Sequence, residues 1–130
     1  MSFNNDKTSG PLTGIRVLDF CSFINGAYSA SLMGDLGADV IKIEPMYGDL
    51  ARAWGPFING ESRPFQTWNR SKRGIRLDLT QAAARQVIYD LTARADVAIA
   101  NFRPGVDSWI GKYIYSLETQ CGSPDVEAHK

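Results

Sequence analysis

Near the start of the chain, two short apolar runs flank a segment with helical spacing. Residues 15–20 (IRVLDF) follow turn-forming glycine and proline residues and predict a buried strand. A helix is predicted next from apolar residues that recur every four positions: Tyr28, Leu32 and Leu36. Asn25 is suited to cap this helix and Gly37 to end it. Residues 39–44 (DVIKIE) predict a second strand that stops at Pro45, which completes a βαβ unit.

The same alternation returns later in the chain. Residues 75–79 predict another strand, and Thr80 is suited to cap the helix that follows. One apolar stripe at helical spacing defines that helix: Ala84, Val87, Ile88, Leu91 and Ala95. Residues 96–100 predict a further strand. Alternating strands and helices favour an α/β fold with a Rossmann-like layered, mostly parallel sheet.

Between the two units, residues 45–74 show no strong period, and loops of this length are usually binding loops, lids or arms. This segment carries four large aromatic residues: Trp54, Phe57, Phe65 and Trp68. Their rings either pin the segment to its own domain or meet a partner subunit or ligand. The sequence leaves both interpretations open.

Composition narrows the class of protein. A chain of 130 residues suits one domain, and its 14 basic and 14 acidic residues cancel, which gives no general attraction to nucleic acid or an anionic membrane. Cys21, Cys121 and the single histidine His129 cannot supply a zinc site, a Ser-His-Asp triad or a disulfide framework. The start lacks the apolar core of a signal peptide, and no run is long enough to span a bilayer. We therefore expect a soluble, cytoplasmic protein.

The turn at residues 20–26 follows the first strand at its carboxyl end, where open α/β sheets bind ligands. The helix that starts there offers free amides to a phosphate, and Glu44 ends the second strand where a dinucleotide fold places its ribose-binding acid. However, the turn has one glycine instead of the G-x-G-x-x-G pattern. An NAD site is therefore a weak alternative.

Two groups of polar residues are suited to bind a phosphorylated nucleotide. Residues 69–73 (NRSKR) combine amide, hydroxyl, guanidinium and ammonium donors, although a basic run is often only a solvated loop edge. Asn101, Phe102 and Arg103 follow the last predicted strand, where Arg103 could equally form a structural ion pair. The carboxylates of the chain are not visibly paired with a base, so we assign no catalytic residue and no metal ligand.

The sequence resembles the class III coenzyme A transferases over residues 11–106. The resemblance rests on four ordered blocks: PLTGIRVLD (11–19), LGADVIKIEP (36–45), NRSKR (69–73) with LDL (77–79), and AD (95–96) with NFRPG (101–105). The aromatic segment before Asn69 is more similar to the transferase branch than to the racemase branch of the family.

This resemblance implies part of a Rossmann-like large domain in an interlocked homodimer that binds coenzyme A and acyl-CoA substrates, without a metal. By position, Lys72 matches a lysine that contacts the cofactor, Asn101 and Phe102 match residues along the adenosine and pantetheine path, and the turn residues Ser22, Phe23 and Ile24 lie near the thioester. The donor clusters add Asn69, Arg73 and Arg103 to this candidate coenzyme A site. Pro45 and Trp109 stand where some members carry cofactor-binding arginines.

The resemblance also implies that a downstream aspartate attacks the acyl-CoA thioester, and that residue would lie beyond Lys130. We therefore expect a polar tail at 1–10, an incomplete large domain at 11–106 and a divergent tail at 107–130, with no turnover by the fragment alone. A non-catalytic coenzyme A- or nucleotide-binding module is the main alternative. A racemase-type or NAD-binding fragment is a further one.

Overall fold

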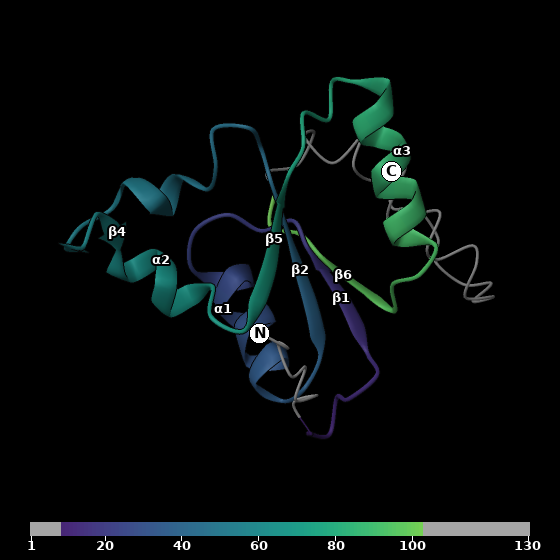
Figure 1. Cartoon of the computed structure of the whole chain (residues 1–130). Helices are drawn as coiled ribbons and strands as arrows, with labels where there is room; N and C mark the ends of the chain where they lie inside the picture. Colours follow the sequence, from purple (N-terminus) through teal and green to yellow (C-terminus); the bar gives the residue numbers. More distant parts are fainter. Residues whose placement is uncertain (1–8, 103–130) are drawn as a thin grey trace, which may run out of the picture.

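The computed structural model describes residues 9–102, which fold around one parallel sheet. Its four strands lie in the order β5-β2-β1-β6 (Figure 1), with these bounds: β1 (Arg16–Asp19), β2 (Asp39–Glu44), β5 (Lys72–Arg76) and β6 (Val97–Ile99). The register pairs Val17 with Val40 on one side of β1 and with Val97 on the other. Because β1 lies between β2 and β6 and runs parallel to both, the carboxyl ends of the three strands lie side by side at one edge of the sheet. The predicted α/β fold with a mostly parallel sheet is confirmed.

Helices α1 (Asn25–Asp35) and α3 (Ala82–Thr92) pack on opposite faces of the sheet. Side chains alternate along a strand, so neighbouring residues face opposite ways. Accordingly, Val17 belongs to the core cluster that includes Ala30 of α1, and Leu18 belongs to the cluster that includes Ile88 of α3. Within residues 9–102, no helix is long and apolar enough to cross a membrane.

Helix α1 meets the sheet through small side chains. Its buried residues are Ala27, Ala30, Ser31 and Gly34. A Cβ atom at Gly34 would lie 2.7 Å from the carbonyl oxygen of Ser71, which shows how closely the helix approaches the chain before β5. The residues with the predicted four-residue spacing, Tyr28, Leu32 and Leu36, are instead 42%, 42% and 47% exposed.

The segment between β2 and β5 projects from one side of the sheet (Figure 1). Its elements have these bounds: η1 (Leu50–Ala53), β3 (Phe57–Ile58), β4 (Glu61–Ser62) and α2 (Arg63–Trp68). The Trp54 ring lies 5.2 Å from that of Phe23 and 6.2 Å from that of Trp68, and the Arg52 guanidinium lies 3.7 Å from the centre of the Phe65 ring. These contacts favour the first interpretation of the aromatic residues, in which they hold the segment to its own domain. Phe57 stays 53% exposed.

Three local predictions were wrong. Strand β5 covers Lys72–Arg76 rather than residues 75–79, because pairing with β2 sets its position and the basic residues hide the strand pattern. Thr80 does not cap α3; its hydroxyl donates to Asp78 Oδ1 at 2.6 Å, and Gln81 occupies the N-cap without a side-chain bond. Asn25 is the first residue of α1 rather than its N-cap, which is Ile24. The predicted end of α1 is confirmed by Gly37, whose φ of 100° suits glycine.

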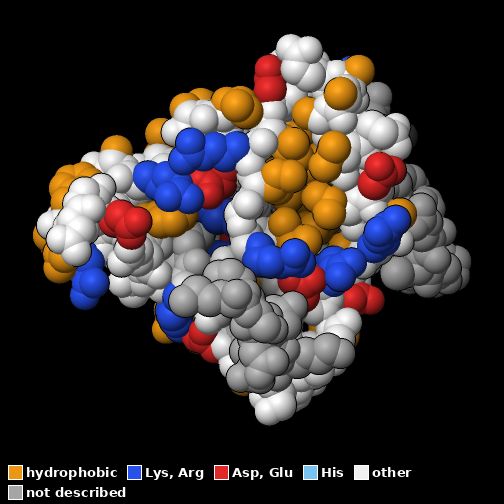
Figure 2. Space-filling model, in the orientation of Figure 1, with side chains coloured by type: hydrophobic (Ala, Val, Ile, Leu, Met, Phe, Trp, Pro, Cys, Tyr) orange, Lys and Arg blue, Asp and Glu red, His pale blue; other side chains and the backbone are white. Residues whose placement is uncertain are grey.

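Hydrophobic side chains gather on the face between β5 and α3, with Lys and Arg side chains at the border of the patch (Figure 2). The core cluster on the α3 side includes several residues that are only partly buried: Ile75, Leu77, Leu79, Leu91, Ala95, Ala98 and Phe102. Within the described residues, α3 therefore covers only part of this face of the sheet, and the rest of the apolar face stays partly exposed.

Candidate functional site at the carboxyl ends of the strands

A cavity of about 700 Å³ opens beyond the carboxyl ends of β1, β2 and β5. Its walls are mostly apolar and come from the turn after β1, the segment after β2, residues 77–80 and Phe102. The predicted site residues Ser22, Phe23 and Phe102 all line it. This is the edge of the sheet where α/β proteins place their ligands.

The first and last site segments meet through reciprocal hydrogen bonds. The backbone amide of Ser22 donates to Asn101 Oδ1 at 3.0 Å, and Asn101 Nδ2 donates to the carbonyl oxygen of Ser22 at 2.8 Å. Strands β1 and β6 are neighbours, so the residues that follow them come together although 79 positions separate them in the sequence. The structure thus joins the two predicted segments into one wall.

Asp49 connects this wall to the segment after β2. One carboxylate oxygen, Oδ1, accepts from the Ser22 hydroxyl at 3.1 Å, the Phe23 amide at 3.5 Å and the Ala51 amide at 2.8 Å. The last bond caps η1. Burial alone would raise the pKa of Asp49, but the bond with Lys42 and the backbone donors hold it below its usual value. Asp49 is therefore a charged acceptor at neutral pH.

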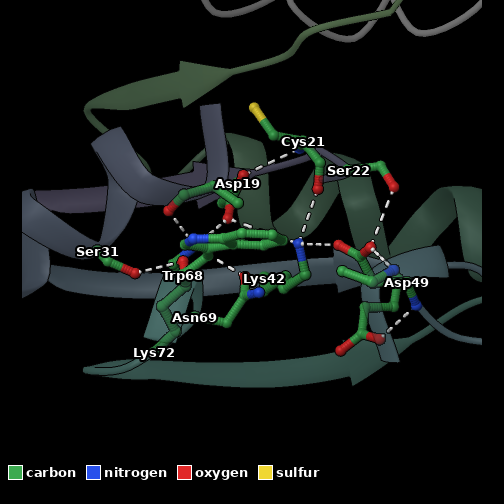
Figure 3. A network of polar contacts seen from close by, with 12 residues as sticks. Asp19, Cys21, Ser22, Ser31, Lys42, Asp49, Trp68, Asn69 and Lys72 are labelled. Atoms are coloured by element: carbon green, nitrogen blue, oxygen red, sulfur yellow. Dashed lines mark hydrogen bonds and ion pairs between the residues drawn. The ribbon is translucent and has the colours of Figure 1, made fainter. Parts of the chain in front are cut away.

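The ammonium of Lys42 lies among three acceptors, two from the end of β1 and one from the segment after β2. Its Nζ donates to the carbonyl oxygen of Cys21 at 2.7 Å and lies 2.9 Å from Asp49 Oδ2 and 3.9 Å from Asp19 Oδ2 (Figure 3). The Lys42 side chain is 3% exposed. In the sequence, this contact is signalled by no more than a lysine inside the apolar run of β2, and neither Lys42 nor Asp49 was among the predicted site residues.

Lys72 lies behind the site and does not reach the cavity surface. Its Nζ donates to Asp19 Oδ2 at 2.7 Å, to the carbonyl oxygen of Ala27 at 2.6 Å and to Asn69 Oδ1 at 3.0 Å (Figure 3). An ammonium group has three donors, and all three are used here. Burial lowers the pKa of Lys72, while the Asp19 carboxylate acts in the opposite direction. The structure thus gives Lys72 and Asn69 internal partners.

The remaining predicted residues divide by position. Ile24 precedes α1 and is 43% exposed beside the turn. Arg73 instead pairs with Asp39 at 2.6 Å, at the start of β2 and so at the opposite end of the sheet from the cavity. Arg103 lies outside the described residues.

Glu44 lines the cavity at the end of β2, but its carboxylate is already engaged. Oε1 and Oε2 accept from Arg52 at 2.7 and 2.8 Å, and Oε2 also accepts from the Asp49 amide at 2.9 Å. Burial raises its pKa and the Arg52 bonds lower it, with a net decrease. These partners leave the acid poorly placed to bind a ribose, which weakens the NAD alternative further.

Cys21 contributes a buried thiol to the cavity wall. Burial and then the neighbouring Asp19 carboxylate raise its pKa to about 12. The thiol is therefore neutral at physiological pH and acts as an apolar wall group. Within the described part of the chain, no group of three His, Cys, Asp or Glu residues could hold a metal ion.

Comparisons with known proteins point to one family. The sequence profile of CoA-transferase family III matches residues 12–113. Acetyl-CoA:oxalate CoA-transferase from Acetobacter aceti is 39% identical over 106 residues, which are 81% of this chain and 27% of that protein. Succinyl-CoA:glutarate CoA-transferase from Mus musculus is 40% identical over 103 residues, 78% of this chain and 24% of that protein.

Solved structures show the same relationship. A CAIB/BAIF family protein from Brucella suis matches with a TM-score of 0.76 and 33% identity over 84% of this chain and 31% of its own. A hypothetical protein from Mycobacterium tuberculosis matches with a TM-score of 0.76 and 35% identity over 87% of this chain and 31% of its own. The chain spans about a quarter of the length of the curated relatives. Profile, relatives and fold agree that the chain belongs to CoA-transferase family III.

Proposed function

We propose that this chain supplies part of the coenzyme A site of an enzyme that moves coenzyme A from an acyl thioester to a carboxylate. The observation that carries the proposal is the reciprocal bonding of Ser22 and Asn101 beside an apolar cavity at the carboxyl end of β1. Family membership and the names of the relatives support the same substrate class.

Within this site we assign the direct contacts to Ser22, Phe23, Ile24, Asn101 and Phe102. The Phe23 and Phe102 rings line the cavity and offer apolar surface to a pantetheine chain or an adenine ring. Asn69 and Lys72 support these contacts from behind, through Asp19 and the start of α1. Arg103 adjoins Phe102 in the sequence and stays a predicted phosphate contact.

Acyl transfer in this family requires a carboxylate that attacks the thioester carbon and expels the coenzyme A thiolate. The carboxylates that line the cavity are occupied: Glu44 binds Arg52, Asp49 binds Lys42, and Asp78 accepts from the Thr80 hydroxyl. We therefore propose that residues 9–102 bind the thioester and that the nucleophile belongs to another part of the enzyme. A non-catalytic coenzyme A-binding module is the second candidate, favoured by the same occupied carboxylates.

We further propose a cytoplasmic homodimer, in line with the family resemblance. The apolar side chains exposed along α1 support an additional protein contact: Ile24, Tyr28, Leu32 and Leu36.

Titration calorimetry with coenzyme A, dephospho-coenzyme A and NAD tests the site. We expect heat with coenzyme A, a weaker response with dephospho-coenzyme A and none with NAD. Asn101→Ala removes both bonds to Ser22 and should weaken coenzyme A binding about tenfold, which corresponds to about 1.4 kcal/mol. Gln86→Ala on α3 is the control, since the exposed Gln86 side chain donates to Asp90 on its own helix, away from the cavity. Absence of coenzyme A binding by the chain, or tighter binding of NAD, contradicts the proposal.

Turnover separates the two candidate functions. The chain is assayed for acyl-CoA:carboxylate exchange alone and with a polypeptide that carries the remaining three quarters of a family member. Activity that appears only in the mixture supports the enzyme fragment, and coenzyme A binding without activity in either sample supports the binding module.

A further inference from the structure

We infer that the buried ion pair Lys42–Asp49 is a positioning pair that holds the turn at residues 21–23 in the shape the coenzyme A site requires. This inference rests on the proposed function. It assigns a role to two residues that contribute no group to the proposed cofactor contacts.

Both members of the pair bind the turn directly. Lys42 Nζ donates to the carbonyl oxygen of Cys21, and Asp49 Oδ1 accepts from the Ser22 hydroxyl and the Phe23 amide, while 2.9 Å separates Lys42 Nζ from Asp49 Oδ2. Figure 3 shows the bonds of the pair to Cys21 and Ser22, and with the Phe23 amide the pair contacts three consecutive turn residues. The side chains of the pair are 3% and 1% exposed, so water does not compete for these bonds.

The turn needs such support because its backbone is unfavourable on its own. Phe23 has a φ of 62°, in the left-handed region that a bulky residue rarely adopts. Strained residues of this kind persist only where the surrounding structure enforces them. The Phe23 ring packs against Trp54, which follows η1, and Asp49 also caps η1. The pair therefore fixes the turn and the segment packed against it together.

Stability alone does not require charges at these positions. Burying an ion pair costs free energy of desolvation, and the attraction between the two charges offsets this cost only in part. Well-packed apolar residues of similar volume are often as stabilising. Lys42 lies between Ile41 and Ile43 in β2, where an apolar residue would fit the pattern of the strand. What apolar residues cannot supply is a set of directional bonds to the backbone of the turn.

The test is the double variant Lys42→Met with Asp49→Leu, which removes both charges at once and leaves the Lys72–Asp19 pair in place. We expect a lower melting temperature with unfolding that stays cooperative, because the turn and the N-cap of η1 lose their bonding partners while the core of the sheet is unchanged. Hydrogen exchange should become at least tenfold faster for the amides of residues 21–23, with strands β1 and β2 still protected. Coenzyme A affinity should fall at least tenfold. The control is Gln86→Met with Asp90→Leu, which removes an exposed hydrogen-bonded pair on α3.

The two readouts keep the hypotheses apart. If the unmodified chain does not bind coenzyme A, the proposed function fails, whereas the exchange experiment still decides whether the pair holds the turn. If the double variant melts as the unmodified chain does and its turn amides exchange at the original rate, the positioning role is wrong. Faster exchange with unchanged coenzyme A affinity also overturns the link between the pair and the site. The single variant Asp49→Asn keeps an acceptor of the same shape. The amides of residues 21–23 should therefore exchange more slowly in it than in the double variant.

Discussion

The buried lysines of this fold lie next to buried carboxylates of opposite charge. Lys72 and Lys42 both approach Asp19, and Asp49 balances Lys42, so two cations and two anions are buried together. The donor cluster at residues 69–73 and the family resemblance both predicted Lys72 as a cofactor contact, but the acceptors that engage it come from α1, β1 and Asn69 at the end of α2. Which donors remain free for a ligand depends on tertiary contacts that no local pattern records.

Lys72→Met should destabilise the fold strongly, because it leaves Asp19 with only the more distant Lys42 as a cationic partner. Removal of one member of a buried pair typically costs about 3–5 kcal/mol. Urea denaturation measures the loss. Arg73→Met, on the same strand but with a pair to Asp39 at the surface, should cost less than about 1 kcal/mol. Equal losses for the two variants would show that Lys72 is not the buried anchor described above.

Cys21 should react with iodoacetamide far more slowly than an ordinary thiol. With a pKa of about 12, only about one thiol in ten thousand is ionised at pH 8, and the rate should rise about tenfold per pH unit above that. The same shift predicts the sign of a pH effect on stability. The folded pKa exceeds the unfolded value of 9.0, so the contribution is complete below pH 9 and decreases as pH rises toward 12.

Mass spectrometry of a Cys121→Ser variant measures the Cys21 rate without interference from the second cysteine. The urea-unfolded chain gives the reference rate for a free thiol. Folded and unfolded rates within a few-fold of each other at pH 8 would be inconsistent with a buried, neutral Cys21.

At the scale of elements, the regular βαβ pattern was visible in the sequence. The structure places β1, β2, α1, α3 and β6 within a few residues of their predicted positions, because short apolar runs and helical spacing mark these elements. The periodic apolar residues of α1 are nevertheless exposed, since its small side chains face the sheet instead. Strand β5 was displaced because its basic residues resemble a loop, and only pairing with β2 defines it. The short elements between β2 and β5 follow no period, since contacts with the rest of the domain position them.

Gly34→Ala tests the close packing of α1 against the chain before β5. The new Cβ would meet the Ser71 carbonyl oxygen at 2.7 Å, which is backbone and cannot move aside easily. We expect a loss of about 1–3 kcal/mol, although alanine is the better helix former. Thermal unfolding measures it. Ser29→Ala on the exposed face of the same helix should change stability by no more than about 0.5 kcal/mol.

At the scale of the whole molecule, the general location of the site could be predicted from the sequence, but the hydrogen bonds and ion pairs within it could not. Ser22 and Asn101 follow neighbouring parallel strands, so a simple rule about sheet edges brings them together. The same rule cannot place Arg73, whose side chain turns toward the other end of the sheet to reach Asp39. The Lys42–Asp49 pair could not be predicted, because a single lysine within an apolar strand does not reveal which carboxylate it will contact.

The exposed apolar residues of α1 should promote self-association of the chain. Leu32→Lys places a charge in the middle of this stripe and should shift the sedimentation profile toward the monomer and reduce binding of an apolar-surface dye. Val87→Lys on α3 is the control, since Val87 is similarly exposed on a different helix. A monomeric parent chain that binds no dye would refute this expectation.

The pairing of β6 beside β1 has a consequence for biosynthesis. Arg16 and Asp96 are 80 positions apart in the sequence, yet the amide of Arg16 donates to the Asp96 carboxylate where these strands begin. A ribosome must therefore release residues 97–99 before the middle of the sheet can close, and until then one side of β1 lacks its hydrogen-bonding neighbour. Nascent chains that end before β6 should therefore expose one unpaired edge of β1, which is a template for pairing with another chain.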